Sequence, residues 1–187
     1  MSRRARAAAA ISMMLLVVVV LVVRNRAAFD NNNATSLPAS QSAGAPLEQR
    51  TKTAGCAMAG ALPDHACTPG EVFEGVMAEK ICASRYARSV RDVPVAEKDQ
   101  VYAEYGIASH QPGQYEVDHL ISLELGGSNG IANLWPETTE PRPGYHEKDR
   151  FENYLHDQVC HGAISLSAAQ QHIAEDWLKY WNEAGEP

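Results

Sequence analysis

Apart from an apolar run near its N-terminus, this chain has almost all of its large apolar residues within positions 56–187, so we expect the hydrophobic core in that part. Residues 27–55 consist mainly of Asn, Ala, Ser, Thr, Pro, Gln and Gly. A segment of this composition cannot bury enough apolar surface to offset the entropy lost on ordering, so we interpret it as a flexible linker. Residues 56–187 are enough for one domain of ordinary size.

Residues 7–23 carry no charge, are almost entirely apolar and lie between arginines. Two alternatives follow for residues 1–26: an uncleaved signal-anchor that crosses a membrane as a helix, or a cleaved secretory signal peptide. The run is longer than a typical signal core, and Arg24 and Arg26 stand where small residues normally precede cleavage, which favours the anchor. Both alternatives export the rest of the chain, either to the outer side of the cell envelope or as a secreted protein.

The four cysteines, Cys56, Cys67, Cys82 and Cys160, all lie beyond the linker. An even number of cysteines in an exported domain favours disulfides. Three pairings are possible, and the sequence does not choose among them. A zinc site is the competing interpretation, but no pair has the C-x-x-C spacing typical of one.

The spacing of apolar residues after residue 56 predicts mostly helices and one small hairpin. A glycine turn, Gly-Gly-Ser-Asn at 126–129, separates two short segments with strand character. The fold class is therefore α+β, a mostly helical domain with a small two-stranded antiparallel hairpin followed by a helix. The predicted helices are 71–84, 95–105, 145–159 and a last one opened by a capping box at Ser167, and the predicted strands are 115–120 and 133–135.

Chemistry-bearing side chains converge on the predicted hairpin. Asp118 and His119 are adjacent at the end of the first strand, Asn133 returns after the turn, and His146 opens the next helix. Neighbouring side chains in a strand point to opposite faces, so Asp118 and His119 can act together only if the strand ends or bends there. An imidazole can accept a proton from water near neutral pH, and carboxylate and imidazole ligands suit a divalent cation. These are the groups needed for metal-assisted hydrolysis of a phosphodiester.

The stretch DHLISLELGGSNGIANLWP, followed by the helix of His146, resembles the HNH endonucleases of the ββα-metal type. Further along, HEKDRFENYLHDQVCHG resembles a subgroup of small exported bacterial proteins that carry such a segment. The resemblance covers about residues 115–160. It implies that His119 is the general base, that Asn133 holds the His119 ring, and that Asp118 and His146 bind one divalent ion, Mg²⁺, Mn²⁺ or Zn²⁺. No other cofactor is implied.

The helix after the hairpin offers further candidates. If its register differs from that of the family, Asp149 or Asn153 takes the place of His146 as the metal ligand, because these positions share one helical face. Lys148 and Arg150 flank the expected metal position and are secondary site candidates.

The charge of the domain argues against tight binding of a polyanion. Residues 56–187 contain nine Lys and Arg against twenty-one Asp and Glu, a formal charge of −12. A local basic rim near the site would offset this charge, and its candidates are Arg85, Arg88, Arg91, Arg142, Lys148 and Arg150.

Three functions follow from the sequence. The first is a metal-dependent nuclease of the HNH type acting on nucleic acid, DNA in preference to RNA. The second is a non-catalytic binding module of the envelope on the same scaffold, and the third is a hydrolase of small phosphoesters. The predicted partners are the nucleic acid and, through residues 1–26, a membrane; no inhibitor or immunity protein is identified by the sequence.

Overall fold

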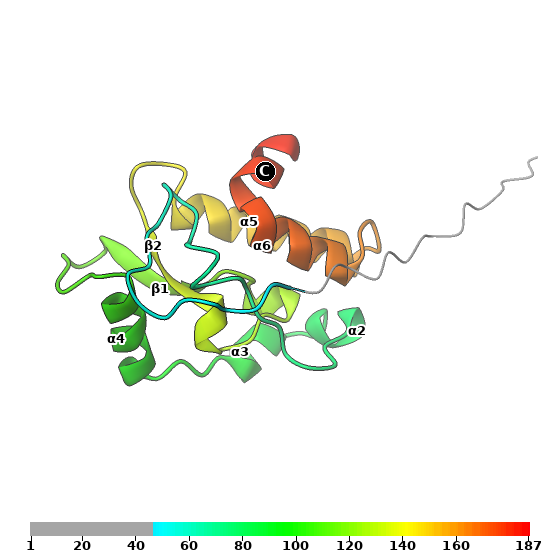
Figure 1. Ribbon diagram of the computed structural model, residues 1–187. Coiled ribbons are helices and arrows are strands. Elements are labelled where there is room, and N and C mark those ends of the chain that lie inside the picture. The colour runs from blue at the N-terminus through cyan, green and yellow to red at the C-terminus, as the bar shows by residue number, and fades with distance from the viewer. Residues whose placement is uncertain (1–46) are drawn as a thin grey trace, which may run out of the picture. The chain divides into compact units, whose positions relative to one another are not determined.

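The computed structural model describes residues 47–187, which contain five α-helices and one two-stranded sheet (Figure 1). This part of the chain mixes helix and strand around an antiparallel hairpin, as predicted. The helices are α2 (Ala78–Ile81), α3 (Tyr86–Val90), α4 (Val95–Glu104), α5 (Tyr145–Cys160) and α6 (Leu166–Glu183); the strands are β1 (Tyr115–His119) and β2 (Leu134–Thr138).

Strands β1 and β2 pair antiparallel, with Val117 opposite Pro136 and His119 opposite Leu134. The predicted second strand was too short, because β2 continues through Pro136 to Thr138. Proline is tolerated there because β2 has a strand neighbour on one side only, so its missing N–H removes no bond from a central ladder.

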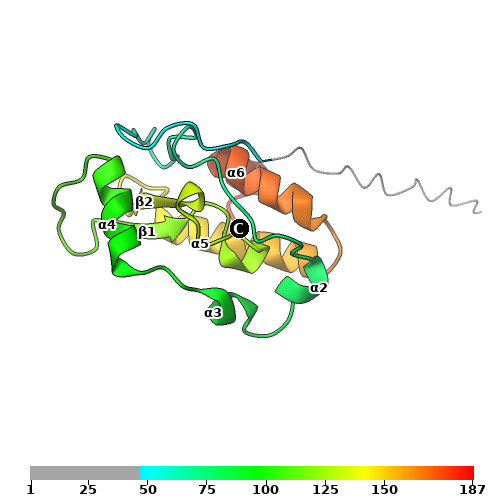
Figure 2. The same cartoon turned by 60° about the horizontal axis from the view of Figure 1, so that its bottom comes forward.

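Helices α5 and α6 pack on each other, and α4 packs on the hairpin. In Figures 1 and 2 the hairpin lies between α4 and α5. Apolar side chains from α5 and α6 form the larger hydrophobic cluster, and those from α4 and the hairpin form a second one around a disulfide. Helix α5 packs on the short 3-10 turn Leu123–Leu125 that follows β1, and Lys148 in its first turn donates to the carbonyl oxygen of His119, which places the end of β1 beside the start of α5.

The two disulfides join Cys56 to Cys67 and Cys82 to Cys160. Disulfides were predicted, and the structure selects one of the three pairings. Both cysteines of the first bridge are buried. The second is exposed and joins the end of α2 to the end of α5.

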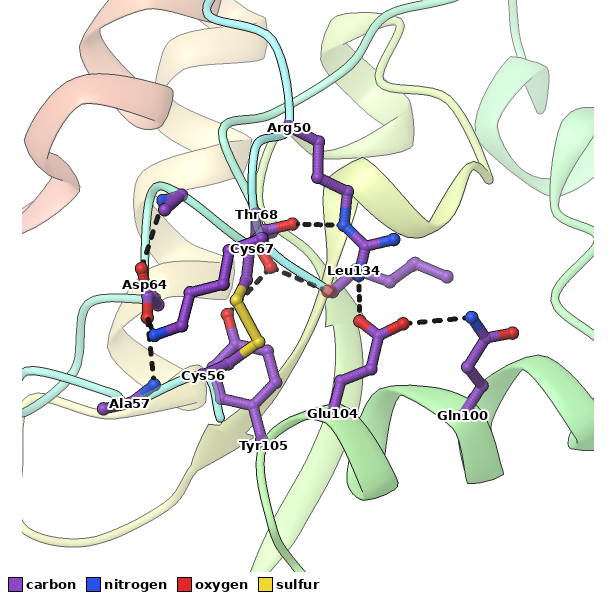
Figure 3. Close-up of a disulfide and its surroundings, with 12 residues drawn as sticks. Arg50, Cys56, Ala57, Asp64, Cys67, Thr68, Gln100, Glu104, Tyr105 and Leu134 are labelled. Carbon is purple, nitrogen blue, oxygen red and sulfur yellow. Dashed lines mark hydrogen bonds and ion pairs between the residues drawn. A yellow bond between two sulfur atoms is a disulfide. The ribbon is translucent and has the colours of Figure 1, made fainter. Parts of the chain in front are cut away.

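Residues 47–55, which the sequence assigns to the flexible linker, lie against the domain. The guanidinium of Arg50 donates to the carbonyl oxygen of Cys67 at 2.8 Å and forms an ion pair with Glu104 on α4 (Figure 3). These contacts anchor the segment beside the buried disulfide, so the ordered part of the chain includes residues that composition alone assigns to the linker.

The predicted helix 71–84 is wrong over most of its length. Val72 forms an isolated bridge with Gly127, and the Phe73 N–H donates to the carbonyl oxygen of Gly126 at 3.0 Å. Gly75 has a φ of +64°, which an α-helix does not accept. Only α2 forms at the end of this segment, because the preceding residues pair with the loop after β1.

The last helix begins earlier than predicted. Its N-cap is Ser165, whose hydroxyl accepts a hydrogen bond from the Ala168 N–H at 3.1 Å. The predicted capping box at Ser167 is therefore wrong by two residues, since Ser165 already satisfies a free N–H of the first turn.

The prediction of a transmembrane segment is not retained. Within residues 47–187, none of the helices combines the length and apolar character needed to cross a bilayer. The run 7–23 on which the prediction rested lies outside the described residues.

Candidate functional site

The end of β1 places Asp118 and His119 on one pocket. Because the strand ends at His119, the two neighbouring side chains are released from strict alternation, and both line a cavity of about 250 Å³. The other walls come from the loop after β1, from α5 and from α3 with the residue that follows it. The remaining lining residues are Ala87, Arg91, Ser122, Leu123, Glu124, Asp149, Glu152 and Asn153.

The glycine turn brings the chain back to this pocket. Gly126 has a φ of +77°, and a Cβ on Gly127 would lie 1.7 Å from the carbonyl oxygen of Ile121. Only glycine fits at Gly127, since any side chain would collide with the loop leaving β1. The close turn delivers Asn129 to the His119 ring.

Asn129 holds the imidazole. The Nδ2 of Asn129 donates to the carbonyl oxygen of Val90 at 2.7 Å, which turns its Oδ1 toward His119 Nε2 at 3.1 Å. Because Oδ1 can only accept, Nε2 carries a proton and Nδ1 carries the lone pair. His119 Nδ1 is buried, has no hydrogen-bond partner among the described residues, and lies 3.5 Å from Asp118 Oδ1.

Asn133 hydrogen-bonds the backbone of the loop after β1, and the ring's hydrogen bond within residues 47–187 is to Asn129. Asn133 is fully buried, and its Nδ2 donates to the carbonyl oxygens of Ile121 and Ser128, each at 2.9 Å. Its Oδ1 accepts from the Ile121 N–H at 2.9 Å, and its carbonyl oxygen accepts from the Leu120 N–H at 2.7 Å. Asn133 therefore positions the backbone that follows His119, while Asn129 is the amide bonded to the ring.

Two carboxylates of α5 join Asp118. Oxygens of Asp118, Asp149 and Glu152 all lie within 4.8 Å of one another. The alternative ligand Asp149 is thus placed in the cluster. His146 is not, because it is exposed in the first turn of α5 and its ring packs against Tyr145 at a centroid distance of 4.4 Å.

Lys148 lies at the centre of the buried charges. Its ammonium donates to the carbonyl oxygen of His119 at 2.8 Å and to the Glu152 carboxylate. It also lies 3.6 Å from Asp118 Oδ2 and 3.8 Å from Glu137 Oε2. Because its side chain is fully buried, Lys148 belongs to the interior of the site and not to the predicted basic rim.

The carboxyl groups differ in protonation. Burial raises the pKa of Asp118, but the Lys148 ammonium opposes burial, and the pKa lies below its ordinary value. Burial raises the pKa of Glu152 to about 8, and the Asp118 carboxylate adds to the shift while Lys148 opposes it. Burial and Asp118 also raise the pKa of Asp149. These acids repel one another and are incompletely neutralised by a single ammonium.

The donor set fits a hard divalent cation. Three carboxylates within reach of one point are typical of Mg²⁺, Mn²⁺ or Ca²⁺ sites, whereas structural zinc prefers Cys and His. Burial is the main cause of the raised pKa values of Asp149 and Glu152, and the Asp118 carboxylate adds to both; this neighbouring negative charge also favours a cation. The Ser122 hydroxyl is also buried and without a hydrogen-bond partner among the described residues, so the pocket holds a second free polar group.

The predicted basic rim is reduced to the arginines at α3. Arg142 and Arg150 lie near the carboxylate of Glu147, and Arg150 also stacks over Trp181 at 5.2 Å. The remaining arginines of the rim are exposed and form no ion pair within 4.0 Å among residues 47–187; they are Arg85, Arg88 and Arg91. Arg91 also lines the pocket.

Asn153, the remaining candidate ligand, lines the pocket, but its side-chain amide donates to the carbonyl oxygen of Asp149 at 2.7 Å. Sequence reasoning did not single out Asn129, Glu137 or Glu152. For Glu152 a signal existed, since it lies three residues after Asp149 and shares its helical face.

Comparison of the chain with protein-family models, curated proteins and solved structures gives no match, so its function has to be inferred from the site itself.

Proposed function

We propose that this chain is a metal-dependent phosphodiesterase of the HNH type, with a ββα-metal core, that hydrolyses nucleic acid, DNA in preference to RNA. One observation carries the proposal. His119, whose buried Nδ1 has no hydrogen-bond partner within residues 47–187, lines the same pocket as Asp118, Asp149 and Glu152. The order of strand, turn, strand and helix around that pocket supports it.

The residues of the pocket have separable roles. His119 Nδ1 takes a proton from water, which then attacks phosphorus. Asn129 keeps the proton on Nε2, so the lone pair stays on Nδ1, the nitrogen beside Asp118. The imidazolium formed by proton transfer is stabilised by Asp118, whose Oδ1 is 3.5 Å away.

A divalent cation held by Asp118, Asp149 and Glu152 would supply positive charge beside the scissile phosphate and the leaving oxygen. Oxygen donors favour magnesium or manganese over zinc for this role. His146, which the family resemblance implies as a ligand, is left out of the proposed set.

The cysteines support a proposed location for the protein. Two disulfides support an oxidising compartment, outside the cytosol, as the place where the chain works.

The proposal is tested by incubating the purified chain with supercoiled plasmid and Mn²⁺. We expect nicked and linear products, and no cleavage when a chelator replaces the metal. A parallel incubation with single-stranded RNA measures the preference between the two nucleic acids. Intact plasmid and RNA with every divalent cation tested would contradict the proposal.

A second candidate function is hydrolysis of a small phosphodiester. The pocket volume of about 250 Å³ and the formal charge of −12 on residues 56–187 both favour a small substrate over a long polyanion. Turnover of a chromogenic phosphodiester without cleavage of nucleic acid would select this function. Binding of nucleic acid without turnover of any of these substrates would select the non-catalytic module.

Metal binding is expected to weaken as the pH falls. The Glu152 carboxyl, with a pKa of about 8, must lose its proton before it can ligate a cation. Below that pH, each further fall of one pH unit should lower the affinity for Mn²⁺ about tenfold, because the ion must displace one proton. Calorimetric titrations at pH 8 and pH 6 measure the effect, and Glu152→Gln should remove most of the pH dependence. An affinity independent of pH in the wild type would contradict it.

Stability should show the opposite trend without metal. The folded-state pKa of Glu152 lies above its ordinary value of 4.5, so the folded state binds more protons between these two pH values. The free energy of unfolding therefore falls as pH rises from about 4.5 to about 8. Adding Mn²⁺ should recover more stability at pH 8 than at pH 5, as measured by the shift in Tm.

Arg91 is expected to contribute to substrate binding. It lines the pocket and is exposed, so its guanidinium is available to a phosphate next to the one cleaved. Arg91→Ala should raise KM for DNA about tenfold. It should also reduce the slope of the logarithm of the DNA-binding constant against the logarithm of the salt concentration by about one. Arg142→Ala is the matched control, because Arg142 is also exposed but lies near the carboxylates of Glu140 and Glu147. Equal effects of the two substitutions would exclude a specific role for Arg91.

A further inference from the structure

The exposed disulfide has an imidazole beside it. His156 and Cys160 are four residues apart on α5, and Cys82 follows α2. The ligand atoms of these three residues all lie within 4.8 Å of one another, and His156 Nε2 is 3.5 Å from Cys160 Sγ. Zinc bound at about 2.3 Å by sulfur and about 2.0–2.1 Å by nitrogen in a tetrahedron puts these two ligands about 3.5 Å apart. The Cys160 and His156 side chains already have that spacing.

The other disulfide provides an internal comparison. Cys56 and Cys67 are buried, and no group of three metal-ligating side chains within residues 47–187 includes them. The bridge Cys82–Cys160 is exposed to solvent and to a reductant. A soft-ligand set of two sulfurs and one imidazole is therefore built at only one of the two bridges.

We propose that Cys82, His156 and Cys160 bind a zinc ion when their disulfide is reduced. A dithiol reductant supplies two electrons and two protons: the S–S bond breaks, Cys82 and Cys160 become thiols, and the dithiol becomes a cyclic disulfide. The freed sulfurs separate, and zinc bound by both needs them about 3.8 Å apart. The ion displaces the two thiol protons, His156 is the third ligand, and water fills the fourth position.

The imidazole must change tautomer in this step. In the disulfide form His156 Nε2 lies 3.3 Å from the carbonyl oxygen of Ile81. A carbonyl oxygen only accepts hydrogen bonds, so Nε2 must carry the proton to donate to it. In the zinc form the Nε2 lone pair faces the ion and the proton resides on Nδ1. The site thereby exchanges one cross-link between α2 and α5 for another. It shares no ligand with the carboxylate pocket and does not rest on the proposed nuclease function.

The test is a titration of the whole chain with Co²⁺, which reports thiolate ligation through a charge-transfer absorption band. The oxidised chain is compared with the chain reduced by a phosphine, because a dithiol would itself bind the metal. We expect the band in the reduced chain, saturating at a single equivalent and lost when Zn²⁺ is added. The oxidised chain should give no band.

Variants assign the ligands. Cys82→Ser should abolish the band, and His156→Ala should weaken Co²⁺ binding at least about tenfold. His161 is exposed at the end of the same helix, and His161→Ala should leave Co²⁺ binding unchanged. Asp149→Asn should also keep the band, because carboxylates give no thiolate absorption. A reduced wild-type chain without the band would overturn the proposal, and this result does not depend on the folding of any variant. Equal binding by His156→Ala and His161→Ala would overturn the assignment of His156.

Discussion

Replacing His119 by alanine is expected to lower the rate of DNA cleavage by about 10²–10⁴-fold, the usual contribution of a positioned general base. The substitution removes His119 Nδ1, which lies 3.5 Å from Asp118 Oδ1 and has no hydrogen-bond partner in the described part of the chain. The rate is measured with a short duplex at saturating Mn²⁺, and circular dichroism checks that the variant remains folded. His161→Ala, exposed at the end of α5, is the matched control and should cleave like the wild type.

A second measurement separates the base from the metal ligands. Because the proposed ligands are Asp118, Asp149 and Glu152, His119→Ala should still bind Mn²⁺ with little change in affinity. Asp149→Asn should behave in the opposite way and lose Mn²⁺ affinity together with activity. If His119→Ala loses Mn²⁺ binding while it remains folded, then His119 is a ligand and its role as base is incorrect.

The hairpin could be predicted because it depends on local patterns. A strand-forming run, a turn with two glycines and a second short run appear in order, and the structure pairs them as β1 and β2. The end of β1 at His119 is also a local property, and it is enough to bring Asp118 and His119 onto one pocket.

The segment 71–84 could not be predicted in the same way. Its apolar residues match helical spacing, but Val72 is placed by its bridge to Gly127, more than fifty residues later. Periodicity in a short window contains no information about such a partner. The same holds for Asn129, whose orientation toward His119 depends on the carbonyl oxygen of Val90.

Lys148 was misplaced at the basic rim for a physical reason. A lysine is rarely fully buried unless it is paired, so a lysine on a polar helix is expected to face solvent. The partners that bury it, Asp118 and Glu137, come from different strands, and only Glu152 is on its own helix. The electrostatic centre of the site is therefore a tertiary feature that a one-dimensional pattern does not reveal.

Removal of this ammonium is expected to be among the most destabilising single changes in the described part of the chain. Lys148→Met keeps most of the length of the side chain but leaves Asp118 buried without its cation, and should lower the free energy of unfolding by about 3–5 kcal/mol. Urea denaturation at pH 7 measures the loss. Lys98→Met, at an exposed position of α4, is the matched control and should change stability by less than about 0.5 kcal/mol.

Glu137 provides the discriminating comparison within the same cluster. Burial raises its pKa well above the ordinary value and outweighs the opposing effect of Lys148, which favours the neutral acid. Glu137→Gln replaces one neutral group by another of the same shape and should cost less than about 1 kcal/mol. A large loss of stability in Glu137→Gln would mean that Glu137 is ionised and shares the charge of Lys148 equally with Asp118. A small loss in Lys148→Met would mean that the Asp118 carboxylate is solvated without the ammonium, which the burial of both side chains argues against.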